Sequence, residues 1–116
     1  MKQNPDITIY VLNWNGAEDT IECLTSLQDL DYDNYSVVVI DNDSSDNSTD
    51  RIKQIFPKQA IVELPKNYGY AGGNNRGFNK IIDKETKYVL FLNNDTIVDK
   101  KFLNKLVDGI NKFGSD

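Results

Sequence analysis

The chain has 116 residues, of which 39% are hydrophobic and 27% are charged, and its formal net charge is -5. These values are ordinary for a folded domain, they exclude a disordered tail or a coiled coil, and the length allows one domain at most. The excess of acidic side chains argues against a nucleic-acid surface, because phosphate backbones are held chiefly by clustered Lys and Arg.

The first half of the chain predicts three strands and two helices. Residues 7–12 are β-branched or aromatic and predict a strand, and the apolar run 37–40 predicts another strand that is buried on both faces. Between them, residues 19–30 place their apolar side chains on one helical face. A second helix is expected over about 49–56, followed by a short third strand at 60–64.

The second half predicts a helix, a fourth strand and a final helix. Residues 66–77 interleave Gly with Asn, which indicates either a flexible loop or a binding loop for a ligand, and a helix is expected to follow over about 75–82. We expect Asn75 to be a buried amide that satisfies the backbone of that loop. The apolar run 88–92 predicts a strand buried on both faces, and residues 99–113 predict an amphipathic helix whose apolar side chains join the core.

Strands that alternate with helices predict an α/β fold with a doubly wound parallel sheet, helices on both faces and the strand order 3-2-1-4. Polar residues follow three strands: Asn13-Trp14-Asn15, Asp41 and Asn93-Asn94-Asp95. Each cluster alone is also compatible with a turn or a helix cap. In the predicted order, however, all three meet at one edge, where their oxygen donors suit a hard divalent cation that carries phosphates.

Residue types that are rare or missing narrow the chemistry. Cys23 is the only cysteine, which excludes an internal disulfide and a cysteine-based zinc site. No histidine occurs, so Ser–His and Cys–His pairs are excluded and acid–base chemistry must use carboxylates. The amino terminus lacks the apolar segment of a signal peptide and no run approaches a membrane span, so we expect a cytoplasmic location, either free or peripheral at the inner face of the membrane.

Four motifs follow one another along the chain. They are Leu12-Asn13-Trp14-Asn15-Gly16, Val39-Ile40-Asp41-Asn42-Asp43-Ser44-Ser45-Asp46, Asn67-Tyr68-Gly69-Tyr70-Ala71-Gly72-Gly73-Asn74-Asn75 and Leu92-Asn93-Asn94-Asp95. In this order and spacing they resemble the nucleotide-binding half of glycosyl transferase family 2, the nucleotide-sugar enzymes with the Rossmann-like GT-A fold, and especially its rhamnosyltransferase-type members. The resemblance implies inverting transfer of a sugar from a UDP- or dTDP-sugar to a hydroxyl of a glycan or lipid-linked acceptor, with Mg²⁺ or Mn²⁺, in polysaccharide biosynthesis.

The resemblance also implies roles for single residues. Trp14 would stack on the nucleobase or wall its site, and Asp41 would accept a hydrogen bond from the ring N–H of uracil or thymine. Asp95 matches the last acid of the Asp-x-Asp metal motif, but Asn93 stands where the first acid would be, and Asn94 would then face the ribose. The nucleotide-binding residues implied are Asn13, Trp14, Asn15, Asp41, Asn74 and Asn94, and the metal-binding residue is Asp95.

The catalytic base stays unassigned, because in the family it is an acidic residue of the carboxyl-terminal half. We therefore expect residues 1–116 to be the nucleotide-sugar-binding part of a longer enzyme, inactive alone and able to self-associate through the exposed edge of strand 88–92. The alternative is a non-catalytic α/β interaction or signalling domain. Such a domain would carry an acidic pair after its first strand and an Asp after its third, where Asn13 and Leu64-Pro65 stand.

Overall fold

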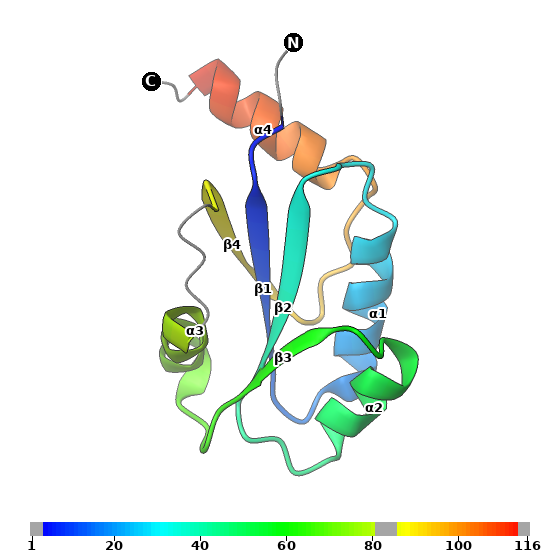
Figure 1. Ribbon diagram of the computed structural model, residues 1–116, viewed down its shortest axis with the longest axis vertical. Helices are drawn as coiled ribbons and strands as arrows, with labels where there is room; N and C mark the ends of the chain where they lie inside the picture. Colours follow the sequence, from blue (N-terminus) through cyan, green and yellow to red (C-terminus); the bar gives the residue numbers. More distant parts are fainter. Residues whose placement is uncertain (1–3, 81–85, 114–116) are drawn as a thin grey trace.

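A computed structural model describes residues 4–80 and 86–113 (Figure 1). Its elements are β1 (Ile7–Asn13), α1 (Ala17–Gln28), β2 (Tyr35–Asp41), α2 (Ser48–Ile55), β3 (Ala60–Glu63), α3 (Gly69–Lys80), β4 (Tyr88–Asn93) and α4 (Phe102–Phe113). The order of strands and helices is the predicted one. The predicted continuation of the third helix through Ile81 and Ile82 lies outside the described residues.

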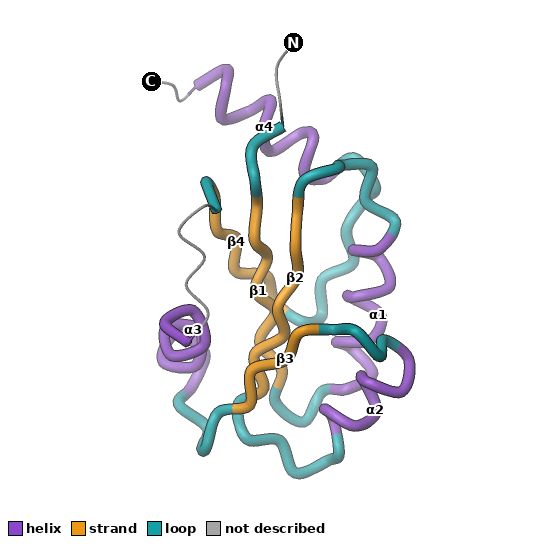
Figure 2. The backbone as a smooth tube through the Cα atoms, in the orientation of Figure 1, coloured by secondary structure: helices purple, strands orange, loops and turns teal. Residues whose placement is uncertain are grey.

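The four strands form one parallel sheet in the predicted order β3-β2-β1-β4 (Figure 2). The central strand β1 lies between β2 and β4, and all of its residues are buried. The chain builds the sheet outward from β1 to β3 and then returns to add β4 on the other side. The switch point of the topology therefore lies between β1 and β4, which is where open α/β sheets bind their ligands.

Helices cover both faces of the sheet (Figure 1). On one face, Ile9 and Val11 of β1 belong to a core cluster shared with α1, α2 and α4. On the other face, Tyr10 and Leu12 pack in a second cluster with Phe78 of α3. This alternation along β1 is the period of two expected of a strand between two helical layers.

The glycine-rich stretch is largely helical, so the prediction of a loop there is wrong. Helix α3 already begins at Gly69, where φ is +77°. A Cβ atom at Gly77 would lie 2.3 Å from Cδ1 of Ile40, and one at Gly73 would lie 2.8 Å from Nδ2 of Asn42. The glycines inside the helix therefore allow close packing on the sheet, a use that the sequence alone does not distinguish from loop flexibility.

Three burial predictions are also wrong. Asn75 is exposed, because Gly73, Asn74 and Gly77 form the buried face of α3. Strand β4 is not buried on both faces, since Val89 and Phe91 remain 39% and 40% exposed on the side where α3 packs mainly over β1 and β2. On α4, Leu103 and Val107 reach the core, whereas Leu106 remains exposed.

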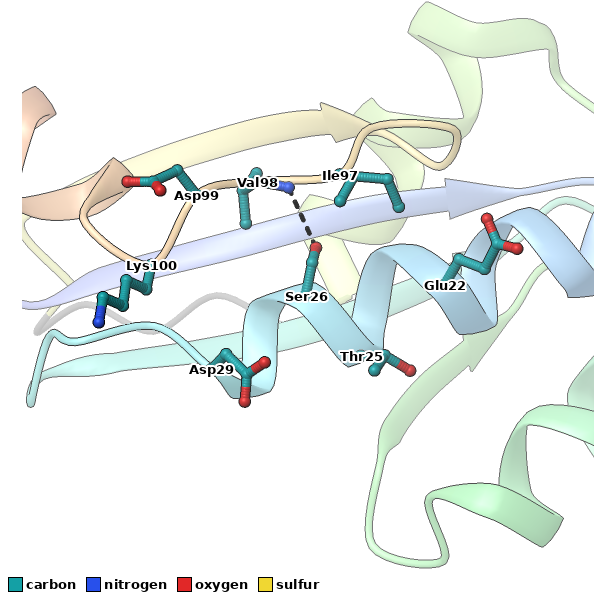
Figure 3. A pocket seen from close by; sticks show the side chains of 8 residues that line it. All are labelled: Glu22, Thr25, Ser26, Asp29, Ile97, Val98, Asp99 and Lys100. Atoms are coloured by element: carbon teal, nitrogen blue, oxygen red, sulfur yellow. Dashed lines mark hydrogen bonds between the residues drawn. The ribbon is translucent and has the colours of Figure 1, made fainter.

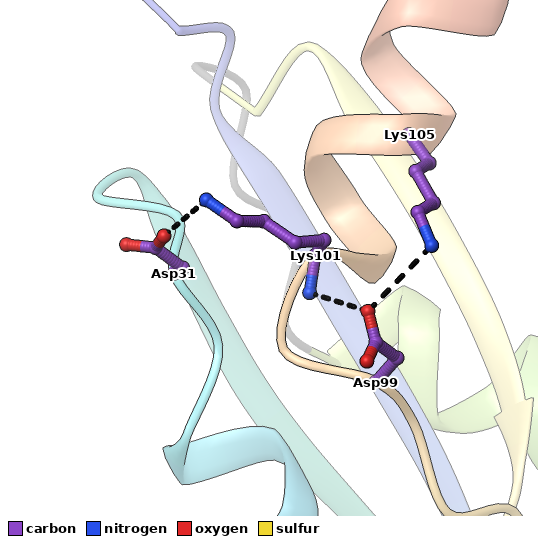
Figure 4. Close-up of polar contacts among 4 residues, drawn as sticks. All are labelled: Asp31, Asp99, Lys101 and Lys105. Carbon is purple, nitrogen blue, oxygen red and sulfur yellow. Dashed lines mark hydrogen bonds and ion pairs between the residues drawn. The ribbon is translucent and has the colours of Figure 1, made fainter.

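Ion pairs fix the start of α4 (Figure 4). Lys101 pairs with Asp31, and Asp99 accepts a hydrogen bond from the backbone N–H of Lys101 at 2.9 Å and lies 3.7 Å from Nζ of Lys105. The hydrogen bond from Lys101 lowers the pKa of Asp31, and the backbone hydrogen bond lowers that of Asp99. Within the described residues, no helix has the length and apolar character needed to cross a membrane.

Candidate functional site

The loops that follow β1, β2 and β4 lie together at the carboxyl edge of the sheet. Asn13 is the register partner of Asp41, and Leu12 is the register partner of Asn93. Because the strands are parallel, the chain leaves all of them at the same edge. The structure thus brings Asn13, Asp41 and Asp95 to one edge, as the strand order predicted.

A buried polar network joins these loops to the start of α1. The Asn13 side chain is fully buried, and its Nδ2 donates to Oδ1 of Asp41 at 2.9 Å. The Thr20 hydroxyl donates to Oδ1 of Asn13 at 2.5 Å and accepts a hydrogen bond from Nδ2 of Asn94 at 3.1 Å. Asn13 and Asn94 therefore hold the loops in place, and Thr20 is a member of the site that sequence reasoning missed.

The Asp41 carboxylate is only 4% exposed and is already hydrogen-bonded. Besides Asn13, it accepts from the backbone N–H of Ser44 at 3.0 Å on Oδ2 and from the Ser44 hydroxyl at 2.7 Å on Oδ1. A carboxylate offers about four acceptor positions. Three are used by the described residues, so one acceptor position on Oδ2 is left unused among them.

Asn15 joins the loop after β1 to the loop after β2. Its backbone is left-handed, with φ 48°, and its N–H donates to the Ser44 hydroxyl at 2.9 Å. Its Oδ1 accepts a hydrogen bond from the backbone N–H of Ser45 at 2.7 Å. The Asn15 side chain, predicted to bind the nucleotide, is thus used to shape the loops.

Asn42 ties the end of β2 to the start of α3, a role that the sequence did not reveal. Its side chain is 2% exposed, and Nδ2 donates to Oδ1 of Asn67 at 2.9 Å and to the carbonyl of Gly69 at 3.0 Å. Its Oδ1 accepts from the backbone N–H of Tyr68 at 3.0 Å. The only sequence signal was an amide directly after a buried strand, which is equally typical of a turn.

A cavity of about 290 Å³ opens beside the switch point. It is lined by Leu12, Trp14, Tyr70, Asn93, Asn94 and Asp95. Trp14 is 53% exposed and Tyr70 is 50% exposed, so both rings are accessible to a ligand. The Asp95 carboxylate is exposed and takes part in none of the hydrogen bonds or ion pairs formed among the described residues. The cavity therefore offers two aromatic surfaces and one free carboxylate.

The donor set fits a metal ion that arrives with its ligand. No group of three or more His, Cys, Asp or Glu side chains is placed to hold an ion anywhere in residues 4–80 and 86–113. Asp95 is the one carboxylate among the residues that line the cavity. Mg²⁺ is commonly held by one or two carboxylates together with phosphate oxygens, and Asp95 can supply the protein's part of such a site.

Asn74, another predicted nucleotide-binding residue, is not among the residues that line this cavity. It is 5% exposed on the buried side of α3, and its Oδ1 has no hydrogen-bond partner among the described residues. The other predicted binding residues divide into two groups. Trp14, Asn94 and Asp95 line the cavity. Asn13, Asn15 and Asp41 instead form hydrogen bonds that join the loops after β1 and β2.

A second hollow of about 650 Å³ lies between α1 and the segment 97–100 (Figure 3). There the Ser26 hydroxyl accepts a hydrogen bond from the backbone N–H of Val98 at 3.1 Å, which fastens the loop before α4 to α1. None of the residues predicted to bind nucleotide or metal lines it. We therefore place the functional site at the cavity beside β1 and β4.

Comparisons with known proteins find relatives by sequence. Residues 8–116 match the profile described as "Glycosyl transferase family 2". The poly-beta-1,6-N-acetyl-D-glucosamine synthase of Staphylococcus aureus (strain COL) is 31% identical over 96 residues, which cover 81% of this chain and 23% of the synthase. The synthase of the same name from Staphylococcus epidermidis is 30% identical over 101 residues, or 84% of this chain and 24% of the synthase. The chain thus spans about a quarter of the length of these relatives.

Solved structures share the fold. S. aureus TarS 1-349 in complex with UDP-GlcNAc superposes with a TM-score of 0.77 at 24% identity, over 92% of this chain and 31% of that chain. The mannosyltransferase PcManGT from Pyrobaculum calidifontis, in complex with GDP-Man and Mn²⁺, superposes with a TM-score of 0.81 at 22% identity, over 93% of this chain and 33% of that chain. At these identities the likeness shows the fold alone, and it confirms the GT-A fold predicted from the sequence.

Proposed function

This chain belongs to glycosyl transferase family 2, and from that premise we propose that it binds the nucleotide-sugar donor of the transfer reaction. The observation that carries the proposal is the cavity at the switch point, where Trp14 and the unpaired carboxylate of Asp95 line one space. An aromatic ring suits a nucleobase, and a carboxylate suits a cation that carries a diphosphate. The presence of an aromatic ring and a carboxylate in one cavity favours a nucleotide ligand over a simple sugar.

We propose that a divalent cation, Mg²⁺ or Mn²⁺, is held by Asp95 and by the diphosphate of the donor. When bound, the ion neutralises the charge that develops on the leaving diphosphate. Asn93 replaces the first acid of the metal motif, and its amide carries no charge. We therefore expect the ion to bind weakly without nucleotide. The Mn²⁺ in the mannosyltransferase complex supports a metal-dependent donor site.

We propose a UDP- or dTDP-sugar as the donor. The remaining acceptor position on Oδ2 of Asp41 would receive the ring N–H of uracil or thymine, while Trp14 would cover the ring. The UDP-GlcNAc complex of TarS supports a UDP-linked donor. Because the mannosyltransferase is in complex with GDP-Man, the affinity for UDP should be compared with that for GDP. Asp41→Asn should reduce the preference for UDP over GDP, as measured by the ratio of their dissociation constants.

The proposed reaction is inverting transfer of the sugar to a hydroxyl of a glycan or lipid-linked acceptor. Asp95 is the one carboxylate of the described cavity, and a metal-bound carboxylate lacks the basicity to deprotonate that hydroxyl. We propose that other residues of a longer transferase supply the base and the acceptor site. Residues 1–116 alone would then bind the donor without transferring the sugar.

A thermal-shift panel tests the donor proposal. UDP, dTDP, GDP and NAD would each be added with and without Mn²⁺ to the 116-residue chain, to Asp95→Asn and to Asp108→Asn, a control on α4. At a ligand concentration of about 100 times Kd, binding stabilises the folded chain by about 2.7 kcal/mol, or roughly 10 °C. We expect UDP and dTDP to raise the Tm with Mn²⁺ in the unmodified chain and the control, and NAD to have no effect. A panel without any nucleotide-dependent shift would contradict the proposal.

A further inference from the structure

We infer that Tyr70 is a nucleobase-stacking residue that forms the second aromatic wall of the cavity beside β1 and β4. The inference rests on the proposed nucleotide binding and adds a residue to it. Tyr70 lies in the first turn of α3, whereas Trp14 comes from the loop after β1, yet both line the same cavity. A planar base has two faces, and Trp14 can cover only one of them.

The exposure of Tyr70 favours a role in binding. Among the described side chains of known exposure, Trp14 at 53% and Tyr70 at 50% are the two most exposed aromatic rings. Tyr10, by contrast, is used in packing: it is 1% exposed and stacks on Phe91 with 5.5 Å between ring centroids. Exposed apolar surface that gathers in one cavity marks a binding site more often than scattered exposed residues do.

The start of α3 is fixed, so the backbone that carries Tyr70 is held beside the cavity before a ligand binds. Asn42 makes hydrogen bonds to residues 67–69, immediately before Tyr70. The absence of a side chain at Gly73 lets the first turns of the helix rest against Leu12 and Asn42. Because this backbone is already ordered, ligand binding does not have to pay the conformational entropy of ordering it.

The size and chemistry of the cavity favour a base with its ribose. Its volume of about 290 Å³ is at the small end of the range for ligand pockets and is too small for a whole nucleotide sugar. Two aromatic surfaces suit a flat ring, and the amide of Asn94 and the carboxylate of Asp95 suit the polar end that continues to the phosphates. The sugar of the donor would then lie outside the aromatic walls.

The test compares Tyr70→Ala and Tyr70→Phe with the unmodified chain and with Ile55→Ala. Ile55 is a matched control, because it is a 55% exposed apolar residue on α2 that does not line this cavity. Calorimetry with Mn²⁺ would give dissociation constants for UDP, UDP-GlcNAc and pyrophosphate. Trp14 is the only tryptophan, so its fluorescence reports directly on this cavity. Unfolding midpoints would show that each variant is folded.

We expect Tyr70→Ala to weaken the binding of UDP and UDP-GlcNAc by the same factor, about 5- to 150-fold, which is the range for one base stacked on an aromatic ring. Tyr70→Phe keeps the ring and should keep the affinity. Pyrophosphate should bind equally to all variants, and UDP but not pyrophosphate should quench Trp14.

Two results would overturn the inference alone while UDP still binds the unmodified chain. One is a loss limited to UDP-GlcNAc, which would place Tyr70 against the sugar. The other is a Tyr70→Ala affinity equal to that of Ile55→Ala. Failure of the unmodified chain to bind any nucleotide would overturn the proposed function and the inference together.

Discussion

Replacing Gly77 by Ala should destabilise the protein, although alanine is the better helix former. The added Cβ would lie 2.3 Å from Cδ1, 2.4 Å from Cγ1 and 2.8 Å from Cγ2 of Ile40. Ile40 is fully buried in β2, so its side chain cannot turn toward solvent to make room. Helix α3 or strand β2 must therefore shift.

The size of the effect follows from two opposing terms. Overpacking of a well-packed core costs about 1–3 kcal/mol, and contacts this short place Gly77→Ala at the upper end. Replacing glycine by alanine in a helix interior stabilises the folded state by about 1 kcal/mol. We expect a net loss of about 2 kcal/mol, or roughly 8 °C in Tm for a domain of this size. Gly109 in α4 has no atom within 4 Å of the added Cβ, so Gly109→Ala should instead gain about 0.5–1 kcal/mol.

Urea denaturation of both alanine variants measures these terms, with the slope m as the check that unfolding stays two-state. Ile40→Ala removes all three atoms that clash, so in the double variant the added methyl group should fill part of the space that is left. The Gly77→Ala substitution should then cost less in the Ile40→Ala background than in the unmodified chain. Equal stability of Gly77→Ala and Gly109→Ala would refute the packing argument.

Three further predictions concern the core, the network and the sheet edge. Burial, with a smaller contribution from Asp95, raises the pKa of the Cys23 thiol from 9.0 to about 11, so the folded chain keeps a proton that the unfolded chain loses. The free energy of unfolding of the unmodified chain, measured by urea titration relative to Cys23→Ala, should fall by about 2.7 kcal/mol in total as the pH rises from 9 to about 11. Parallel pH profiles of the two proteins would argue against this. Thr20→Val breaks the hydrogen bonds to Asn13 and Asn94 and should cost about 1–3 kcal/mol in the same assay, whereas the exposed Thr25→Val should cost less than about 0.5 kcal/mol. The outer edge of β4 has no partner strand within the described part of the chain, so light scattering should show a concentration-dependent dimer, and a strict monomer would count against this.

The fold was predictable because its signals are local and repetitive. Apolar runs such as 37–40, with a helical pattern between them, leave few topologies other than a parallel sheet. The helical nature of 69–77 was not predictable in the same way. Gly73 and Gly77 matter through atoms of Leu12, Asn42 and Ile40 that lie far away in the sequence, and glycine alone indicates a loop as readily as close packing.

The location of the site was predictable, but which of its residues face a ligand and which hold the loops together was only partly predictable. Strand order brings Asp41 and Asp95 to one edge, and this follows from the pattern alone. Which polar side chains face a ligand depends on hydrogen bonds between loops. Asn13 and Asn15 are used within the protein, whereas Tyr70, which no motif singled out as a contact, lines the cavity.

The most direct test of the donor site is a calorimetric titration of UDP with and without Mn²⁺. It would be carried out on the unmodified chain, on Asp95→Ala and on the α4 control Asp108→Ala. We predict that Mn²⁺ strengthens the binding of UDP to the unmodified chain and to the control, and that this metal dependence disappears in Asp95→Ala, because Asp95 is the one carboxylate that lines the cavity. The same metal-assisted affinity in Asp95→Ala would contradict the assignment of the metal to this residue and of the donor to this cavity.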